Sequence, residues 1–181
     1  MNKNLQSHLI EKCKNNNAKA QMQLYDLYCK AMYNTACNFI KDDVVAQDIM
    51  QEAFIKAFKK METYTGEASF GAWLKRIVIN QSLDYLKKQK IDTVVIDEKV
   101  IPLADDENWE IESVISLQDI YKCIELLPNK CKNVVKLYLI EGYDHQEVAQ
   151  ILQITEGSSR SQLSRGKNRL KELLIPINYE S

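Results

Sequence analysis

The chain has 181 residues, of which 45% are apolar and 27% are charged, and its formal net charge is −1. This is an ordinary composition for a globular protein of one domain or two small ones. No apolar run is long enough to span a membrane, and the N-terminal MNKNLQSHLI lacks the apolar core of a signal peptide. From these features we expect a cytoplasmic protein rather than a secreted or membrane-inserted one.

Cysteine and histidine spacing argues against a metal site. The five cysteines form no CxxC pair, and His8 and His145 do not complete a zinc-binding pattern. In the cytoplasm, buried and reduced thiols are the expected state. We expect no metal and no cofactor. An enzyme, such as a thiol hydrolase using a cysteine and His145, is the weakest hypothesis, because no cysteine lies in a nucleophile motif.

Charge is distributed unevenly along the chain. Bases outnumber acids between residues 54 and 90, acids dominate from 91 to 112, and the last segment is basic again. Two basic blocks separated by an acidic one indicate two nucleic-acid-binding surfaces and a connector that avoids the polyanion.

Helical periodicity dominates the N-terminal half. Apolar stripes from Tyr25 to Ile40 and from Val45 to Met61 recur at three- and four-residue steps, which predicts two core-facing helices. The polar stretch TYTGEAS, residues 63–69, predicts a loop. From Phe70 the helical step resumes and continues into the lysines before residue 90. These elements predict an all-helical N-terminal domain over residues 8–90.

An acidic linker is predicted over residues 91–112, because Pro102 and the density of acids argue against a packed element. Apolar stripes then predict two helices. The first ends near Leu127 and Pro128, and the second ends at Gly142 in the role of a left-handed cap.

The stretch from Asp144 to Leu174 predicts two helices joined by a tight turn. Asp144 and Glu147 have the spacing of a capping box, the turn falls at Gln153-Ile154, and Thr155 can cap the second helix. From 160 to 171 the second helix carries only basic charges. The predicted fold is therefore all-α, with two small helical bundles joined by the acidic linker. The second bundle, residues 113–175, is a four-helix domain with a helix-turn-helix shape that fits a DNA major groove. The plainer alternative is a helical hairpin with a solvated charged face.

Two groups of polar side chains in the N-terminal domain are candidate binding sites. Asp48, Gln51 and Glu52 project from one side of their helix, which is either a solvated face or a docking surface for a partner. The second group combines cations for phosphate, amides for base edges and an aromatic residue in a mobile loop. These are the ingredients of a surface for single-stranded nucleic acid. Its members are Tyr64, Lys75, Arg76, Asn80 and Gln81.

Four stretches follow one another along the chain: VVAQDIMQEAFIKAFKK, FGAWLKRIVINQSLDYLKK, LPNKCKNVVKLYLIEGYDHQEVAQIL and ITEGSSRSQLSRGKNRLKELL. The first two resemble region 2 of bacterial RNA polymerase sigma factors, and the last two resemble region 4. No sizeable domain lies between them, which is typical of the small extracytoplasmic-function (ECF) class of the sigma-70 family. Four matches in the right order cover most of the chain and are far more specific than a helix-turn-helix alone.

The resemblance implies a factor that binds core RNA polymerase through Asp48, Gln51 and Glu52 and directs promoter recognition, DNA melting and transcription initiation. A non-template base of the minus-ten element would be extruded into a pocket at the loop 63–70. Lys75, Arg76, Asn80 and Gln81 would meet the backbone and neighbouring bases. No covalent chemistry would fall to this chain. An anti-sigma protein is a further implied partner.

The resemblance also places the second helix of the C-terminal domain in the major groove of the minus-thirty-five element. Arginines there would read guanine, Gln162 would pair with adenine, and the serines would meet phosphates. The candidate contacts are Ser158, Ser159, Arg160, Ser161, Gln162, Arg165 and Lys167.

This second helix departs from the family pattern. Ser159 stands where many members have a branched apolar residue, a loss on the order of 1 to 2 kcal/mol of apolar burial. Gly166 replaces the usual alanine, at up to about 1 kcal/mol. Gln162 is often arginine elsewhere. We therefore expect a recognition helix looser than in relatives.

Two alternatives to a sigma factor stay open. Response-regulator output domains share a similar four-helix bundle, so a stand-alone helix-turn-helix transcriptional regulator is one of them. The basic block at 54–90 disfavours it, because a simple repressor needs no strand-holding surface. The other alternative is a sigma-like adaptor that binds polymerase without melting DNA.

Overall fold

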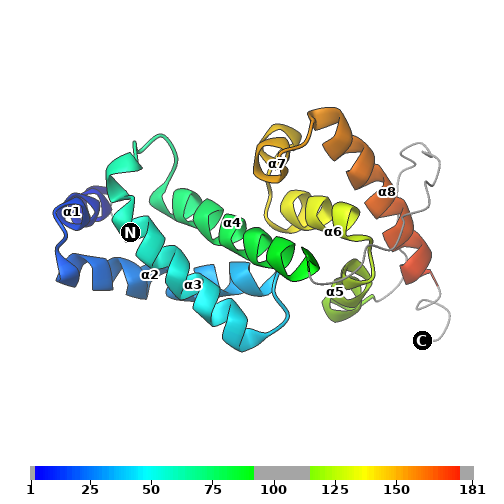
Figure 1. The fold of residues 1–181 in the computed structure, drawn as a ribbon, viewed down its shortest axis with the longest axis horizontal. Helices are drawn as coiled ribbons and strands as arrows, with labels where there is room; N and C mark the ends of the chain where they lie inside the picture. The colour runs from blue at the N-terminus through cyan, green and yellow to red at the C-terminus, as the bar shows by residue number, and fades with distance from the viewer. Residues whose placement is uncertain (1–2, 92–114, 176–181) are drawn as a thin grey trace. The chain divides into compact units, whose positions relative to one another are not determined.

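The computed structural model describes residues 3–91 and 115–175, and every regular element in these ranges is helical (Figure 1). The chain divides into two compact units, Met1–Val94 and Val95–Ser181. The all-α fold class is thereby confirmed for the described ranges. The predicted acidic linker falls outside them except for its first residue.

Between residues 3 and 91, the N-terminal unit contains four α-helices and one short 3-10 turn. They are α1 (Lys3–Lys14), α2 (Ala18–Cys37), α3 (Asp43–Lys59), η1 (Met61–Thr63) and α4 (Phe70–Ile91). Helices α2, α3 and α4 pack against one another, and α1 packs against α2 and η1. Helix α1 buries Leu9, Ile10 and Cys13 and was not predicted from the sequence.

Side-chain caps begin two of these helices. The Asn17 side chain accepts a hydrogen bond from the Ala20 amide at 3.0 Å and starts α2. The Asp42 carboxylate accepts from the Val44 amide at 2.9 Å and starts α3. Each cap satisfies backbone donors that a helix start leaves without partners. The predicted stripe overran the end of α2, since Phe39 lies beyond Cys37, yet Phe39 is buried in the connection.

Large apolar side chains fill the centre of the N-terminal unit. Leu24 of α2, Phe54 of α3 and Leu74 of α4 are at most 2% exposed. The Tyr25 and Phe54 rings lie 4.8 Å apart between centroids. Full burial of each such residue stabilises a fold by about 1.5 to 3 kcal/mol, so this core holds α3 and α4 in place for the surfaces they present.

Over residues 115–175, the C-terminal unit contains four α-helices and a π-helical turn. They are α5 (Leu117–Glu125), α6 (Asn129–Val135), η2 (Lys136–Ile140), α7 (His145–Leu152) and α8 (Glu156–Leu174). Helix α8 packs against α5, α6 and α7 (Figure 1). Pro128 separates α5 from α6 as predicted, and Gly142, at φ +77°, follows η2.

The turn η2 is a feature that periodicity did not predict. The Glu141 amide donates to the Lys136 carbonyl at 3.0 Å, five residues back, where an α-helix would bond four residues back. The helix therefore widens just before the chain turns toward α7.

Local chemistry fixes the α7–α8 pair as predicted. The Asp144 and Glu147 side chains and amides bond reciprocally at 2.8 and 3.0 Å, which completes the capping box. Gln153 adopts the left-handed conformation at φ +58° in the turn. The Thr155 hydroxyl accepts from the Ser158 amide at 3.1 Å and starts α8.

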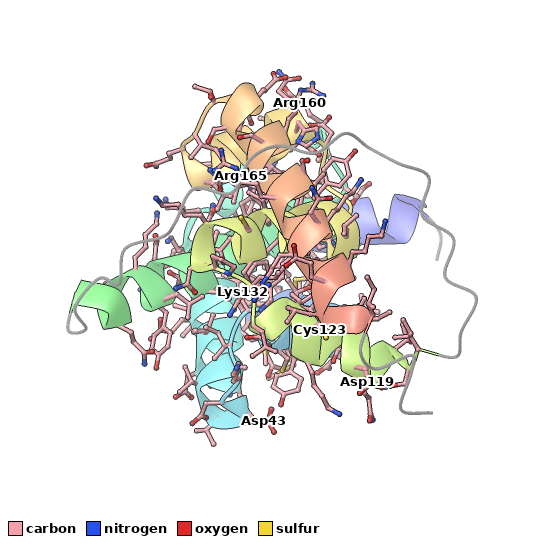
Figure 2. All side chains as sticks on the ribbon, turned by 90° about the vertical axis from the view of Figure 1, so that its right-hand side faces the viewer. Asp43, Asp119, Cys123, Lys132, Arg160 and Arg165 are labelled. Carbon is pink, nitrogen blue, oxygen red and sulfur yellow. The ribbon has the colours of Figure 1, made fainter. Side chains whose placement is uncertain are left out.

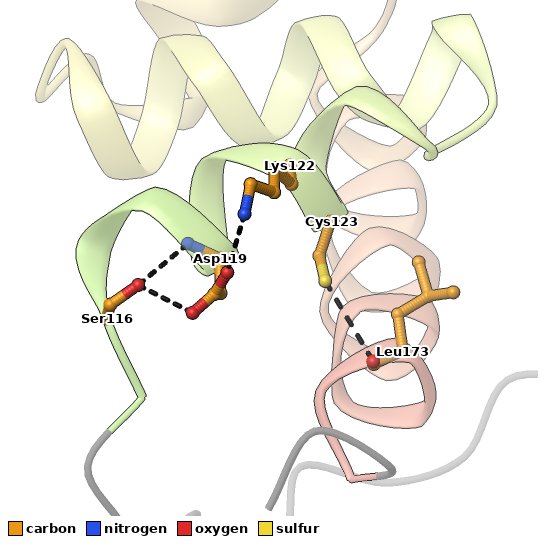
Figure 3. Close-up of polar contacts among 5 residues, drawn as sticks. All are labelled: Ser116, Asp119, Lys122, Cys123 and Leu173. Carbon is orange, nitrogen blue, oxygen red and sulfur yellow. Dashed lines mark hydrogen bonds and ion pairs between the residues drawn. The ribbon is translucent and has the colours of Figure 1, made fainter. Parts of the chain in front are cut away.

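A short polar network begins α5 and ties it to α8 (Figure 3). Ser116 caps the helix by accepting from the Asp119 amide at 3.2 Å, and Lys122 Nζ lies 3.0 Å from the Asp119 carboxylate. Hydrogen bonds from Ser116 and Lys122 lower the pKa of Asp119. The Cys123 thiol faces the Leu173 carbonyl of α8 at 3.9 Å. Burial raises the pKa of this thiol, so it is protonated and unreactive at neutral pH.

A buried charge cluster joins α5 to α6 and η2. The Lys136 side chain is 4% exposed, and its Nζ lies 2.5 Å from Glu125 Oε1. Lys132 donates to the Glu125 backbone carbonyl, and its Nζ lies 3.5 Å from Glu125 Oε2. One carboxylate thus faces two ammonium groups. The sequence analysis did not predict this cluster.

Gly166 corrects the expectation of a loose recognition helix. A Cβ atom at this position would lie 2.6 Å from Val135 Cγ2 and 3.5 Å from Cys131 Cβ, both on α6. Glycine is therefore what allows α8 to approach α6 so closely. Glycine lowers the helix propensity here, but it also lets α8 pack tightly against α6. The expectation that α8 is loose at this position is therefore wrong.

We predict that Gly166→Ala destabilises the C-terminal unit by about 1 to 3 kcal/mol, because overpacking outweighs the gain of about 1 kcal/mol in helix propensity. Amide hydrogen exchange in α6 and α8 measures this unit separately. Gly157→Ala is the matched control, since the nearest atom to a Cβ there is Thr155 Oγ1 at 4.0 Å. Equal protection in both variants would contradict the packing argument.

We also predict that Glu125→Gln destabilises the same unit by about 3 to 5 kcal/mol, because it removes the carboxylate that pairs with the buried Lys136 ammonium. The control is Glu172→Gln. It removes the partner of Arg169 in an ion pair whose side chains are about half exposed, and such a pair contributes about 1 kcal/mol or less. Urea unfolding followed by circular dichroism compares the two. A control as damaging as Glu125→Gln would refute the assignment.

Candidate nucleic-acid interface

The polar residues predicted on α3 are exposed and share one face of the helix. Val44 and Ile55 lie on the same face and are 69% and 54% exposed. We call these five residues the α3 stripe: Val44, Asp48, Gln51, Glu52 and Ile55. The α3 stripe therefore combines charged and apolar side chains on one exposed face.

A groove of about 310 Å³ lies between α3 and α4 beside the α3 stripe. Its lining residues are Glu52, Ile55, Lys56, Lys59, Lys60 and Gln81. Lys56 Nζ donates to Gln81 Oε1 at 3.4 Å. Three lysines therefore meet at the edge of the stripe. The sequence analysis placed them in a basic block, but their convergence depends on how α3 packs on α4.

Four aromatic rings gather around the loop that precedes α4. The Tyr64 ring lies 5.7 Å from Phe70 and 5.3 Å from Trp73, and Tyr28 of α2 lies 5.4 Å from Phe70. We call these rings the aromatic cluster. Gly71 permits it, since a Cβ there would lie 2.9 Å from Tyr28 Cε1. The cluster joins the loop to α2 and to the start of α4.

Tyr64 is anchored, which corrects its predicted place in a mobile loop. Its hydroxyl donates to the Ala68 carbonyl at 2.8 Å, and its ring is half-buried. Burial, followed by the proximity of Tyr28, raises the pKa of Tyr64. The phenol is therefore neutral over the physiological range and acts as a donor. The Tyr64 side chain thus closes the loop between η1 and α4 by bonding the Ala68 carbonyl.

The predicted α4 residues do not all share one face. Arg76 and Asn80 are four residues apart and lie on the side of Trp73, so they adjoin the aromatic cluster. Gln81 instead faces the groove beside α3. Lys75 lies neither on the Trp73 side of α4 nor on the side of the groove. All four of the predicted side chains on α4 are half-buried.

Helix α8 carries the predicted contacts on two sides, and Figure 2 labels Arg160 and Arg165 among them. Ser158, Ser161, Gln162 and Arg165 follow helical spacing on one side, which we call the α8 face. Arg160 and Lys167 are seven residues apart and lie on a second side, and both charges act on His145 of α7. Arg169, which was not among the candidates, continues the α8 face and pairs with Glu172 at 2.5 Å.

The α8 face is preorganised by its own hydrogen bonds. Gln162 Nε2 donates to the Ser158 hydroxyl at 2.8 Å, and the Ser161 hydroxyl donates to the Ser158 carbonyl at 3.0 Å. Arg165 is half-buried, and its Nε is buried with no hydrogen-bond partner among the residues that the structure describes.

Ser159 does not belong to the α8 face. It is fully buried, and its hydroxyl lies 2.9 Å from His145 Nδ1. This arrangement removes Ser159 from the groups that can touch DNA, which corrects its predicted role. It also offsets part of the expected burial loss, since a hydrogen bond inside a protein contributes about 0.5 to 1.5 kcal/mol.

Two other kinds of site are absent from the described ranges. Residues 3–91 and 115–175 hold no group of three His, Cys, Asp or Glu side chains placed to bind a metal ion. Over the same ranges, no helix has the length and apolar character needed to cross a membrane.

Comparison with known proteins assigns a family to both units. Residues 24–91 match the model of sigma-70 region 2, and residues 117–170 match that of sigma-70 region 4. The chain is 26% identical to the RNA polymerase sigma-H factor of Pseudomonas aeruginosa, over 96% of this chain and 95% of that protein. It is 27% identical to the ECF RNA polymerase sigma factor SigW of Bacillus subtilis, over 91% and 94%.

The fold has a counterpart among solved structures. The sigma factor RpoE, in complex with the anti-sigma factor NepR from Bartonella quintana, superposes with a TM-score of 0.61 at 25% identity, over 85% of this chain and 96% of that one. Both family regions occur in the order predicted from the four sequence stretches, and they cover both bundles. The chain therefore belongs to the sigma-70 family of RNA polymerase sigma factors, in its extracytoplasmic-function class.

Proposed function

We propose that this sigma factor divides promoter recognition among three surfaces, with the α3 stripe on core polymerase, the aromatic cluster on the minus-ten element and the α8 face on the minus-thirty-five element. A sigma factor binds core RNA polymerase and directs promoter-dependent initiation, and the chain does so as a member of the family. The observation that carries the proposal is that both family regions are present and that each exposes a face of the predicted residues.

The α3 stripe suits a protein partner. Asp48 and Glu52 supply negative charge at the centre, while Val44 and Ile55 offer apolar area at the two ends. Interfaces of this composition combine apolar anchors with charges that set orientation and association rate. The lysine groove beside Ile55 would lie at the boundary between polymerase and DNA, where its charge can receive the DNA backbone.

The aromatic cluster suits the capture of an unpaired base. Extrusion of a base costs a few kcal/mol of stacking and pairing. Stacking on an aromatic ring returns about 1 to 3 kcal/mol, and it requires a ring already held in place. Tyr64 is held by Ala68, Phe70 and Trp73. Arg76 and Asn80, on the Trp73 side of α4, are placed to receive the adjoining backbone and base edge.

The α8 face suits duplex DNA. Arg165 has the guanidinium geometry for guanine or phosphate, and Gln162 has the amide for adenine. Arg160 and Lys167, on the neighbouring side, are placed to contact the phosphates that border the groove. Because Ser159 is buried, the contacting set is Ser158, Arg160, Ser161, Gln162, Arg165 and Lys167.

An anti-sigma protein is part of the proposal. The solved relative from Bartonella quintana is bound to one, and this chain shares its fold over most of its length. Exposed apolar side chains on the α3 stripe are suited to such a partner, which would then compete with core polymerase. The stand-alone regulator is not favoured, because it leaves the region 2 match without a role.

The first test of the proposal uses Asp48→Lys combined with Glu52→Lys. Core polymerase with the wild-type chain is expected to open a promoter identified by sequencing RNA after overproduction of the chain. The double variant should bind core polymerase at least about tenfold more weakly, because charge reversal opposes the interface. Fluorescence anisotropy of labelled chain measures the affinity.

The matched control for this test is Glu62→Lys combined with Asp84→Lys, which changes the net charge equally at exposed positions off the stripe. Equal weakening in both double variants would point to a general charge effect and remove the α3 stripe from the interface. A wild-type chain that opens no promoter with core polymerase would refute the function itself.

The second test is Tyr64→Ala, which should reduce open-complex formation about five- to hundredfold, the equivalent of losing one stacked base. Binding to the closed promoter should change little, since duplex contacts lie on α8. Permanganate reactivity of the unpaired strand measures opening. Tyr64→Phe keeps the ring and should retain most activity. A template with a pre-formed bubble should rescue Tyr64→Ala, and failure of that rescue would contradict a role in melting.

A further inference from the structure

Three elements of the C-terminal unit meet on one imidazole ring. His145 is the first residue of α7, and its Nδ1 lies 2.9 Å from the Ser159 hydroxyl of α8. Its ring packs against Tyr138 of η2, with centroids 4.6 Å apart and planes inclined by 31°. Ser159 is fully buried. His145 is therefore the polar link between the two helices of the helix-turn-helix.

The surroundings keep this ring neutral. Burial is the largest cause that lowers the pKa of His145, and the Arg160 and Lys167 charges of α8 act in the same direction. Asp144, at the start of α7, and Glu156 of α8 act in the opposite direction. A neutral imidazole has one N–H and one lone pair, and the Ser159 hydroxyl can complement either at Nδ1. The hydrogen bond is thus available at physiological pH.

The position of Ser159 makes the bond matter for α8. Ser158, on the α8 face, and Arg160, on the neighbouring side, adjoin it directly in the chain. A bond that holds Ser159 in place limits the rotation of α8 about its axis. Because Ser158 and Arg160 belong to the same helix, it also fixes the directions of their side chains. Deeper along α8, the close packing at Gly166 restrains the approach to α6. The His145 bond restrains the other end, near the turn from α7.

We propose that His145 is a positioning residue for DNA recognition: by bonding Ser159 it fixes the rotation of α8 against α7, and so the placement of the α8 face, without touching DNA itself. This inference rests on the proposed function, because it assigns to His145 an effect on minus-thirty-five binding. It concerns a polar pair at a position where the family pattern led us to expect apolar packing.

A pair of substitutions at His145 separates the bond from the rest of the side chain. The amide of His145→Asn places a polar atom where Nδ1 stands, whereas that of His145→Gln reaches the place of Nε2 instead. Both remove the ring that packs on Tyr138, so they match in that loss. Ser159→Ala removes the bond from the other side. Gln146→Ala, at an exposed neighbour, is the control.

Promoter affinity is measured with holoenzyme assembled from core polymerase and each full-length variant. His145→Gln and Ser159→Ala should each weaken binding about three- to tenfold, the equivalent of one net hydrogen bond. The variant that combines both changes should bind the promoter no more weakly than either single variant. His145→Asn should bind at least about threefold more tightly than His145→Gln. The slope of log affinity against log salt should stay unchanged, because no phosphate contact is lost.

Three results would overturn the inference: equal affinity of His145→Asn and His145→Gln, fully additive losses in the combined variant, or a reduced salt slope, which would mean direct contact with DNA. Wild-type holoenzyme reports separately on the proposed function. If His145→Gln or Ser159→Ala unfolds the C-terminal unit, nitrogen NMR of the wild type decides. His145 and His8 are the two histidines of the chain. One environment for Nδ1 of His145 that differs from that of Nδ1 of His8 would support the hydrogen bond. Identical behaviour of the two histidines would refute it.

Discussion

The close approach of α8 to α6 sets the geometry of the whole C-terminal unit. With glycine at 166, the α8 backbone comes near enough to Val135 that a methyl group would overlap it. This contact places the apolar side of α8, including Leu163 and Leu170, in the interior and turns the α8 face outward. Interiors pack at crystal-like density, so a shift at one such contact moves the elements around it. The cap at Thr155 and the hydrogen bond at Ser159 then act on a helix whose distance from α6 is already fixed.

In the N-terminal unit the corresponding constraint is the packing among α2, α3 and α4. Phe54 and Leu74 are fully buried, which leaves the α3 stripe and the Trp73 side of α4 as outward surfaces of a rigid support. Functional surfaces on regular helices are better preorganised than surfaces on loops. The one loop in the proposal, around Tyr64, is held by two aromatic neighbours of that residue, Phe70 and Trp73, and by its own hydrogen bond. Preorganisation of this kind lowers the cost of ordering on binding.

Much of the fold was predictable because local rules decide it. Helical periodicity placed α3, whereas the capping box at Asp144, the turn at Gln153 and the cap at Thr155 placed α7 and α8 from residue chemistry. Contacts between residues far apart in the chain were not predictable from one sequence. The Glu125–Lys136 pair, the proximity of Gly71 to Tyr28 and the burial of Ser159 each depend on how helices pack. The π-helical turn η2 gave no periodic signal, because five residues are too few to establish one. Ser159 is instructive, since a serine on a basic helix suggests a phosphate contact until its neighbours are known.

The carboxylate shared by Lys132 and Lys136 has a consequence for how the protein responds to its ionic surroundings. At physiological ionic strength, dissolved ions largely screen the interactions between exposed charges that lie more than about 8 to 10 Å apart. They screen a buried ion pair much less. The cations proposed to contact DNA on α8 are exposed or half-buried, whereas Lys136 is 4% exposed. Added salt should therefore weaken the proposed DNA contacts at concentrations that leave the fold of the C-terminal unit intact.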